Sequence, residues 1–285
     1  SVISNDTARQ LSKGGGGTLV LTGANTYTGV TRLETGTLSV ASLANPGANS
    51  SIGNYPTSGA GGLSLIGGTF RYTGSTASTN RGFTLSGNST FEVNSAATTL
   101  NLGNCDSLDA LGILTVTGGT GSSLTLGQVR IVEAAQITLS PTTIPMTVAS
   151  ANGYTSYPNT SILTLGGTAT GNVITGTISA TNPPGSGFSQ PLNVVKSGTS
   201  DWTLAGVFSS GTLTVNAGTL TLAGAGSYIG VTTVAGGTLI AGTNAPSNVN
   251  GAFGKSTSEV VLGVAGGNTN ASILTGGAFT IGRII

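Results

Sequence analysis

The chain contains no histidine, one cysteine, one tryptophan and one methionine among its 285 residues. Without histidine, Ser-His-Asp and Cys-His catalysis are excluded, as are zinc sites with an imidazole ligand. The single cysteine, Cys105, cannot form an intramolecular disulfide or a cysteine-based metal site. We therefore expect Cys105 to be a small buried side chain, and we predict no metal and no cofactor.

Charge is equally scarce. Charged residues make up 6% of the chain, against roughly 25% in ordinary globular proteins. Nine basic and eight acidic residues leave a net charge of +1, so binding to nucleic acid or to an anionic membrane has no electrostatic basis. A hydrophobic content of 37% with balanced charges predicts a folded chain. No apolar run reaches the length of a membrane-spanning helix, and no secretory signal opens the sequence, so we expect neither.

The few acidic residues offer one catalytic candidate. Asp106 and Asp109 lie close together, with Arg130 further along the chain, and a polysaccharide lyase or glycosidase on a β-helix needs paired carboxylates. The alternative, which we favour, is that both aspartates are solvated turn residues at the end of a strand. The run Gly14–Gly17 lacks the Lys-Ser/Thr and the helix of a phosphate-binding loop. We predict no enzyme, with no catalytic, cofactor-binding or metal-binding residue.

The chain is rich in glycine, with 48 residues, and in Thr, Ser and Val, which favour turns and strands over helices. One phrase occurs twice. GTLVLTGANTYTGVTRLETGTL, Gly17–Leu38, and GTLTLAGAGSYIGVTTVAGGTL, Gly218–Leu239, agree at 13 of 22 positions without a gap. A repeat of this kind indicates a repetitive architecture.

Within the phrase, Leu19 and Leu21 alternate with polar residues, so both leucines point to one face of a strand. Three such short strands between glycine turns, over about 20 residues, fit one coil of a parallel β-solenoid, which buries its apolar face only by stacking on neighbours. The repeat-defining residues are Gly17, Leu19, Leu21, Gly23, Tyr27, Gly29, Gly36, Leu38, Gly218, Leu220, Leu222, Gly224, Tyr228, Gly230, Gly237 and Leu239. We expect Leu38 and Leu239 to face the interior, and Gly29 and Gly230 to have positive φ or to allow close backbone approach.

A longer period is also visible, because Lys13–Gly23 aligns with Lys196–Gly206. We predict one continuous solenoid over 1–285, with a long unit at 13–195 and the start of a second at 196–285. The fold is all-β, with about 12 to 14 coils. Six of the nine prolines lie within 141–191, and proline cannot donate to a central ladder, so we expect the longest loops there.

The phrase G-T-L-x-L-x-G-x-x-x-Y-x-G-V-T followed by G-T-L resembles the autotransporter-associated β-strand repeat, also called the passenger-associated transport repeat. Family-like segments also include GGTFRYTG (Gly67–Gly74) and STNRGFTLSG (Ser78–Gly87). The resemblance implies a right-handed parallel β-helix in a large bacterial surface or secreted protein. It also implies an adhesive or structural role outside the cell.

Three function classes stay open from the sequence. The first is a stackable rod in a surface fibre or filament, or the passenger of an adhesin that also contacts surface glycans. The second is ice or carbohydrate binding by Thr-x-Thr pairs such as Thr115 with Thr117; the third is the polysaccharide-cleaving enzyme. Buried packing residues and sugar-stacking platforms are alternative roles for Tyr27, Tyr72, Trp202 and Tyr228.

The two ends suggest a partner. The closing segment, ILTGGAFTIGRII, still resembles strand, and no polar capping coil follows it. We therefore expect head-to-tail stacking of coils, either within one long polypeptide or between neighbouring copies of this chain, with itself as the main partner.

Overall fold

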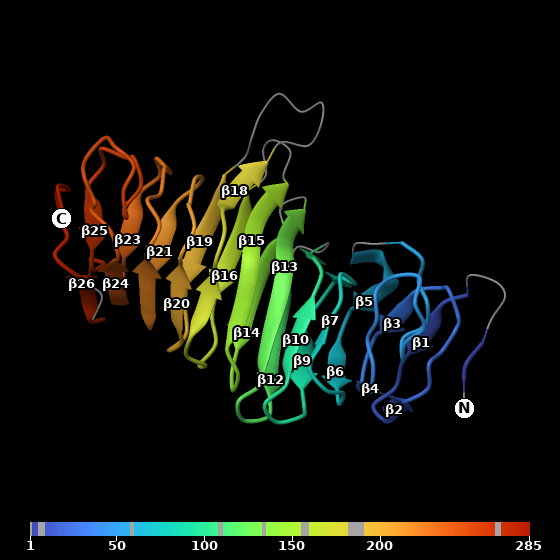
Figure 1. The fold of residues 1–285 in the computed structure, drawn as a ribbon. Helices are drawn as coiled ribbons and strands as arrows, with labels where there is room; N and C mark the ends of the chain where they lie inside the picture. The colour runs from blue at the N-terminus through green and yellow to red at the C-terminus, as the bar shows by residue number, and fades with distance from the viewer. Residues whose placement is uncertain are drawn as a thin grey trace.

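The computed structural model describes residues 2–4, 9–57, 60–107, 111–132, 135–154, 160–181, 191–265 and 269–285. Parallel strands stack side by side along one axis, and the two termini lie at opposite ends of the stack (Figure 1). The described residues contain one short 3₁₀ helix, η1 (Ala60–Gly62), and otherwise strands and turns. Every pairing between named strands is parallel, as a solenoid requires: each strand meets its partners from neighbouring coils.

One sheet has 11 strands and forms a single column, here called face B. Its strands, in stacking order, are β2 (Thr18–Leu21), β4 (Thr37–Val40), β6 (Gly68–Tyr72), β9 (Ser89–Val93), β12 (Gly112–Gly118), β14 (Gln136–Pro141), β16 (Ser161–Leu165), β19 (Leu192–Lys196), β21 (Leu213–Val215), β23 (Thr232–Val234) and β25 (Val260–Leu262).

The other sheet has 15 strands and consists of two columns that share the two long strands β13 (Ser123–Val132) and β15 (Met146–Tyr154). Face A contains β1 (Leu11–Lys13), β3 (Thr31–Leu33), β5 (Leu63–Leu65), β8 (Phe83–Leu85), β11 (Cys105–Ser107), the second halves of β13 and β15, and β18 (Ile178–Thr181). Face C contains β7 (Ala77–Ser78), β10 (Thr99–Leu102), the first halves of β13 and β15, β17 (Asn172–Ile174), β20 (Asp201–Leu204), β22 (Thr219–Leu222), β24 (Gly237–Ala241) and β26 (Ala271–Thr275).

The chain visits the faces in the order C, A, B in each coil, as β7, β8 and β9 illustrate. The longest path through the larger sheet crosses 12 strands, at the low end of the coil number expected from the sequence. The prediction of an all-β parallel solenoid is confirmed. Coil length varies more than expected: Thr18 stacks on Thr37, 19 residues later, but Thr37 stacks on Thr69, 32 residues later.

The two copies of the repeated phrase lie on different faces. In the first copy a glycine turn joins β3 on face A to β4 on face B; in the last copy the equivalent turn joins β23 on face B to β24 on face C. The stacking inside each copy is the same, because Leu19 pairs with Leu38 and Leu220 pairs with Leu239. The repeat has therefore moved round the solenoid by one face between the two ends of the chain.

The interior is a continuous apolar core. Leu38 and Leu239 are 0% exposed, as the two-residue alternation predicts. Aromatic rings stack between coils: the ring centroids of Phe70 and Phe91 are 4.9 Å apart, and those of Phe208 and Tyr228 are 4.5 Å apart. Cys105 is completely buried in this core.

The prolines behave differently from the expectation of long loops where the structure describes them. Pro141 ends β14 opposite Val116, and only Thr142–Pro145 connect it to β15, so this connection is short. A proline at the end of a strand removes no internal ladder bond, which is why it is tolerated there. Pro158, Pro183 and Pro184 lie outside the described residues.

Candidate functional site: the outer faces of the solenoid

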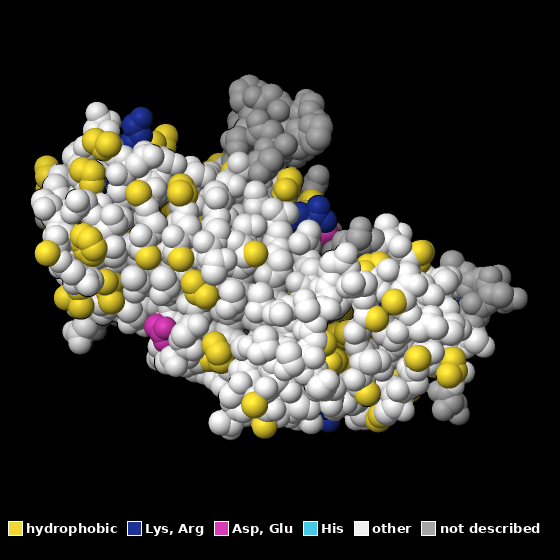
Figure 2. Space-filling view, in the orientation of Figure 1, with side chains coloured by type: hydrophobic (Ala, Val, Ile, Leu, Met, Phe, Trp, Pro, Cys, Tyr) yellow, Lys and Arg dark blue, Asp and Glu magenta, His cyan; other side chains and the backbone are white. Residues whose placement is uncertain are grey.

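The outward side chains of face B form a row of hydroxyl groups, here called the threonine ladder. Its members stack in register on consecutive strands: Thr18, Thr37, Thr69, Thr90, Thr115 and Ser140. Neighbouring strands lie about 4.8 Å apart, so the hydroxyls repeat at that spacing. The face of the molecule in Figure 2 is correspondingly dominated by neutral polar and backbone atoms, with few charged side chains.

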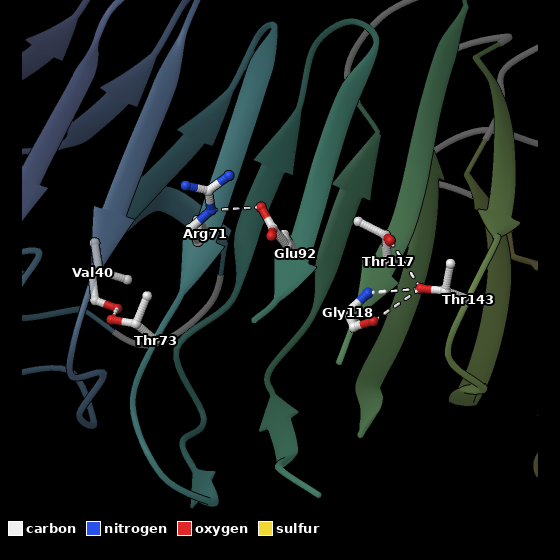
Figure 3. Close-up of polar contacts among 7 residues, drawn as sticks. All are labelled: Val40, Arg71, Thr73, Glu92, Thr117, Gly118 and Thr143. Atoms are coloured by element: carbon white, nitrogen blue, oxygen red, sulfur yellow. Dashed lines mark hydrogen bonds and ion pairs between the residues drawn. The ribbon is translucent and has the colours of Figure 1, made fainter. Parts of the chain in front are cut away.

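The row beside the ladder is irregular. It reads Val20, Ser39, Arg71, Glu92 and Thr117 along the same strands. Arg71 Nε donates to Glu92 Oε2 at 2.7 Å, while the hydroxyls of Thr117 and Thr143 lie 2.9 Å apart (Figure 3). An ice-binding surface needs two regular hydroxyl rows, and an ion pair interrupts the second row here. The outer face therefore has the chemistry of a neutral, solvated wall.

Asp106 and Arg130, two members of the catalytic candidate, are direct neighbours on face A. Arg130 Nε donates to Asp106 Oδ1 at 2.6 Å, and Arg130 Nη2 forms an ion pair with Asp106 Oδ2. The hydrogen bond to Asp106 is the main cause that raises the pKa of Arg130. The prediction of a solvated turn is wrong for Asp106, which lies within β11 and is 8% exposed; a paired strand residue is what the cross-strand arginine permits.

Asp109 lies outside the described residues. A carboxylate that an arginine holds in a bidentate pair is not poised as a general acid or base. Within the described parts of the chain, no three His, Cys, Asp or Glu side chains gather where they could bind a metal ion. The described helical residues likewise include no helix long and apolar enough to cross a membrane.

The buried cations serve the glycine turns. Lys13 Nζ donates to the carbonyl oxygens of Gly14, Gly15 and Thr35 at 2.8, 2.7 and 3.0 Å. The equivalent Lys196 Nζ donates to Ser197, Gly198 and Ala217 at 2.7, 2.9 and 3.1 Å. Each ammonium thus ties the turn of its own coil to the turn of the next, and burial lowers the pKa of Lys196 to about 8.

The aromatic candidates are interior packing residues. Tyr27, Tyr72, Trp202 and Tyr228 are all at most 2% exposed, so none offers a ring to a sugar. The Tyr27 and Tyr228 hydroxyls lie 2.7 Å from the hydroxyls of Thr31 and Thr232. Trp202 Nε1 donates to the carbonyl of Gly166 at 3.1 Å. Burial raises the pKa of Tyr27 and of Tyr228.

The glycines after the tyrosines match one of the two expected explanations. Neither Gly29 nor Gly230 has positive φ. A Cβ at Gly29 would clash with the carbonyl of Arg9, and one at Gly230 would clash with the carbonyl of Gly211. Close backbone approach therefore explains both positions. The positive φ occurs instead at the glycines of the tight turns, including Gly36, Gly218 and Gly237.

This geometry of short strands, glycine turns and stacked 19-residue coils agrees with the comparisons to known proteins. The model of the passenger-associated-transport-repeat family matches residues 11–40, 194–221 and 216–241. The chain carries passenger-associated transport repeats. It is also similar to the Adhesin BmaC autotransporter of Brucella suis biovar 1 (strain 1330), with 47% identity over 85 residues. That match covers 30% of this chain and 2% of the relative, and no solved structure matches.

The transport repeats coincide with the parts of the solenoid that have tight glycine turns and a lysine at the first turn. The first repeat begins with β1 and Lys13, and the second begins with β19 and Lys196. The coils between them, which contain β13 and β15, have no match to the family model. There the strands are longest and run across two faces without a turn.

Two features of the site were missed in the sequence. Arg81 is 3% exposed and donates from Nε to the carbonyl of Ala44 and from Nη2 to that of Gly53. Arg283 plays the same part 202 residues later, with Nη1 donating to the carbonyl of Phe253. A buried arginine in a chain with so few charges was the available signal. The change of face between the two repeats had no signal, because both repeats have the same local pattern.

Proposed function

We propose that this segment is a rigid, extracellular rod in the passenger of a bacterial autotransporter-type adhesin, with a structural and adhesive role and no catalysis. The single observation that carries the proposal is the uninterrupted parallel stacking of family repeats from β1 to β26 around an aliphatic core. Each coil adds ladder hydrogen bonds and a buried layer, so stability grows with the number of coils. The likeness to an adhesin over part of the chain supports the surface role.

The surface chemistry supports a rod that stays soluble without net charge. Its cations and anions are paired or buried: Arg32 with Glu34 at 3.0 Å, Arg71 with Glu92, and Arg130 with Asp106. Four further cations, Lys13, Lys196, Arg81 and Arg283, are at most 7% exposed. Trypsin cleaves after Lys and Arg, so few accessible sites remain in the folded chain.

The head-to-tail partner is part of the same proposal. Coils of this kind stack on one another through open ladder edges, either in one long polypeptide or between copies of this chain. Exposed apolar side chains gather in the last coils, where β25 and β26 lie: Val261, Leu262, Val264, Leu274, Phe279, Ile284 and Ile285. A following coil would cover such a layer.

Electron microscopy, limited proteolysis and cell binding test this function together. We expect elongated particles or threads, resistance of the folded chain to modest trypsin, and adhesion to cultured host cells of beads coated with folded protein. Beads coated with heat-unfolded protein are the matched control. Rapid trypsin digestion of the folded chain to small peptides would contradict the rod, and equal adhesion of both bead types would contradict the adhesive role.

A further inference from the structure

The outer side of face A carries a row of polar side chains across eight strands. In stacking order its members are Ser12, Arg32, Ser64, Thr84, Asp106, Arg130, Asn152 and Ser179. From β11 to β18 the row changes from small hydroxyls to carboxylate, guanidinium and amide groups. Face B over the same coils keeps Thr115, Ser140 and Thr164. The two faces therefore differ in chemistry although the solenoid beneath them is the same.

The middle of this row is organised by hydrogen bonds between neighbouring strands. Arg130 and Asp106 form their bidentate pair, Gln128 Nε2 donates to Asn152 Oδ1 at 2.9 Å, and Asn152 Nδ2 donates to Ser179 Oγ at 3.0 Å. Tyr154 is half-buried on the same face. These six residues, Asp106, Gln128, Arg130, Asn152, Tyr154 and Ser179, are here called the polar patch. Its planar groups are held in place before any ligand arrives, which lowers the entropy cost of binding.

The connections beside the polar patch are the longest at this corner of the solenoid. Two residues lie between β5 and β6, whereas six lie between β15 and β16 and ten between β18 and β19. Solenoids accept insertions on one edge of the stack, and that edge is often the binding face. The diversity of side chains and the length of the connections coincide at the same coils, although neither follows from the other.

The charge of the polar patch restricts its ligand. Asp106 and Arg130 neutralise each other, and the remaining members are amides, a hydroxyl and a phenol. A surface without net charge has no attraction for acidic glycans or basic peptides, whereas paired donors and acceptors and a partly exposed aromatic ring suit a neutral polyol. We propose that the polar patch binds a neutral oligosaccharide, which would be the surface ligand of the adhesive function proposed above and rests on it.

The test uses the whole chain against an array of neutral and acidic glycans, followed by titration of the best neutral oligosaccharide. We expect neutral glycans to bind, with little change between low and high salt because no net charge is involved. The variants Gln128→Ala and Asn152→Ala should each weaken binding about tenfold. Thr90→Ala on the threonine ladder is the matched control and should leave binding unchanged.

All three side chains are partly exposed, so each variant should fold, and unfolding curves verify this. Absence of any bound glycan, binding of acidic glycans only, or equal binding by the patch variants and Thr90→Ala would each overturn the proposal. If coated beads still adhere to cells while no glycan binds, the polar patch is wrong and the adhesive function stands. If that adhesion requires a cell-surface protein and survives removal of glycans, the ligand is a protein and the proposal is also wrong.

Discussion

The first transport repeat and the last have the same internal geometry but occupy different faces of the solenoid. In both, a tyrosine hydroxyl contacts a threonine four residues later, at 2.7 Å. In both, a lysine from the preceding coil caps turn carbonyls. Yet β2 and β4 belong to face B, while the equivalent β22 and β24 belong to face C. The repeat specifies how one coil stacks on the next, and it does not specify which face of the solenoid each strand joins.

The difference arises in the middle of the chain. There β13 pairs with both β10 and β11, and β15 pairs with both β17 and β18, so each long strand covers two faces at once. On the N-terminal side the tight corner lies between faces A and B, and on the C-terminal side it lies between faces B and C. Coils without a tight corner separate two blocks that have one, and the second block starts one face later.

The largest effect should come from the core leucines. Leu38→Ala and Leu239→Ala should each lower the free energy of unfolding by about 2 to 5 kcal/mol, because each removes a completely buried side chain and leaves a cavity. The two losses should be similar in chemical denaturation, although the leucines lie on different faces. Val20→Ala, at a position that is 60% exposed, is the control. A loss below about 0.5 kcal/mol for Leu38→Ala would show that the alternation has been placed in the wrong phase.

The turn glycines should be nearly as sensitive. Gly36→Ala and Gly218→Ala should each cost about 2 to 4 kcal/mol, because both residues have positive φ and an added Cβ would lie 2.6 Å from the ammonium of Lys13 or Lys196. Gly15 has a similar φ with open space around it, so Gly15→Ala should cost only about 1 kcal/mol. Thermal unfolding compares the three. Equal costs at Gly15 and Gly36 would mean that φ alone, and not the lysine cage, requires glycine.

The pH dependence should distinguish the last lysine. Burial holds the pKa of Lys196 at about 8 in the folded chain, below its ordinary value of 10.5. Between these values the unfolded chain binds more protons, so the free energy of unfolding should rise with pH from 8 to 10, by about 1 to 3 kcal/mol. Above pH 10 the raised pKa of buried Tyr228 has the opposite effect, and stability falls.

Denaturation curves at several pH values measure this rise. Lys196→Met should abolish it, whereas Lys255→Met, at an exposed position, should keep it. A rise that persists in Lys196→Met would have to come from another group.

The smallest effect concerns the tyrosines. Tyr27→Phe and Tyr228→Phe should each cost about 1 kcal/mol, because each leaves the ring in place and removes one buried hydrogen bond to Thr31 or Thr232. The double variants Tyr27→Phe with Thr31→Val and Tyr228→Phe with Thr232→Val report the coupling in each repeat. Unequal coupling energies would show that the face on which a repeat lies changes its local energetics.

Much of the fold could be predicted from the sequence because the pattern is local. The alternation around Leu19 and Leu38 defined strands and their inward face, and the 19-residue spacing defined the coil. The roles of Asp106 and Arg130 could not be predicted, because their pairing joins residues 24 positions apart through strand register. The boundary between long units at residues 195 and 196 stays a prediction, as does the right-handed sense of the coils.

The sequence by itself determined the coil: alternating apolar residues, glycine turns and the buried tyrosine act within one repeat or between adjacent ones, where spacing along the chain equals spacing in the structure. Only the tertiary structure decided how the coils are oriented around the axis. The two long strands β13 and β15 pass a corner without a turn, and every coil stacked beyond them inherits that offset. Such an offset accumulates through strand register over many coils, so no single repeat contains it.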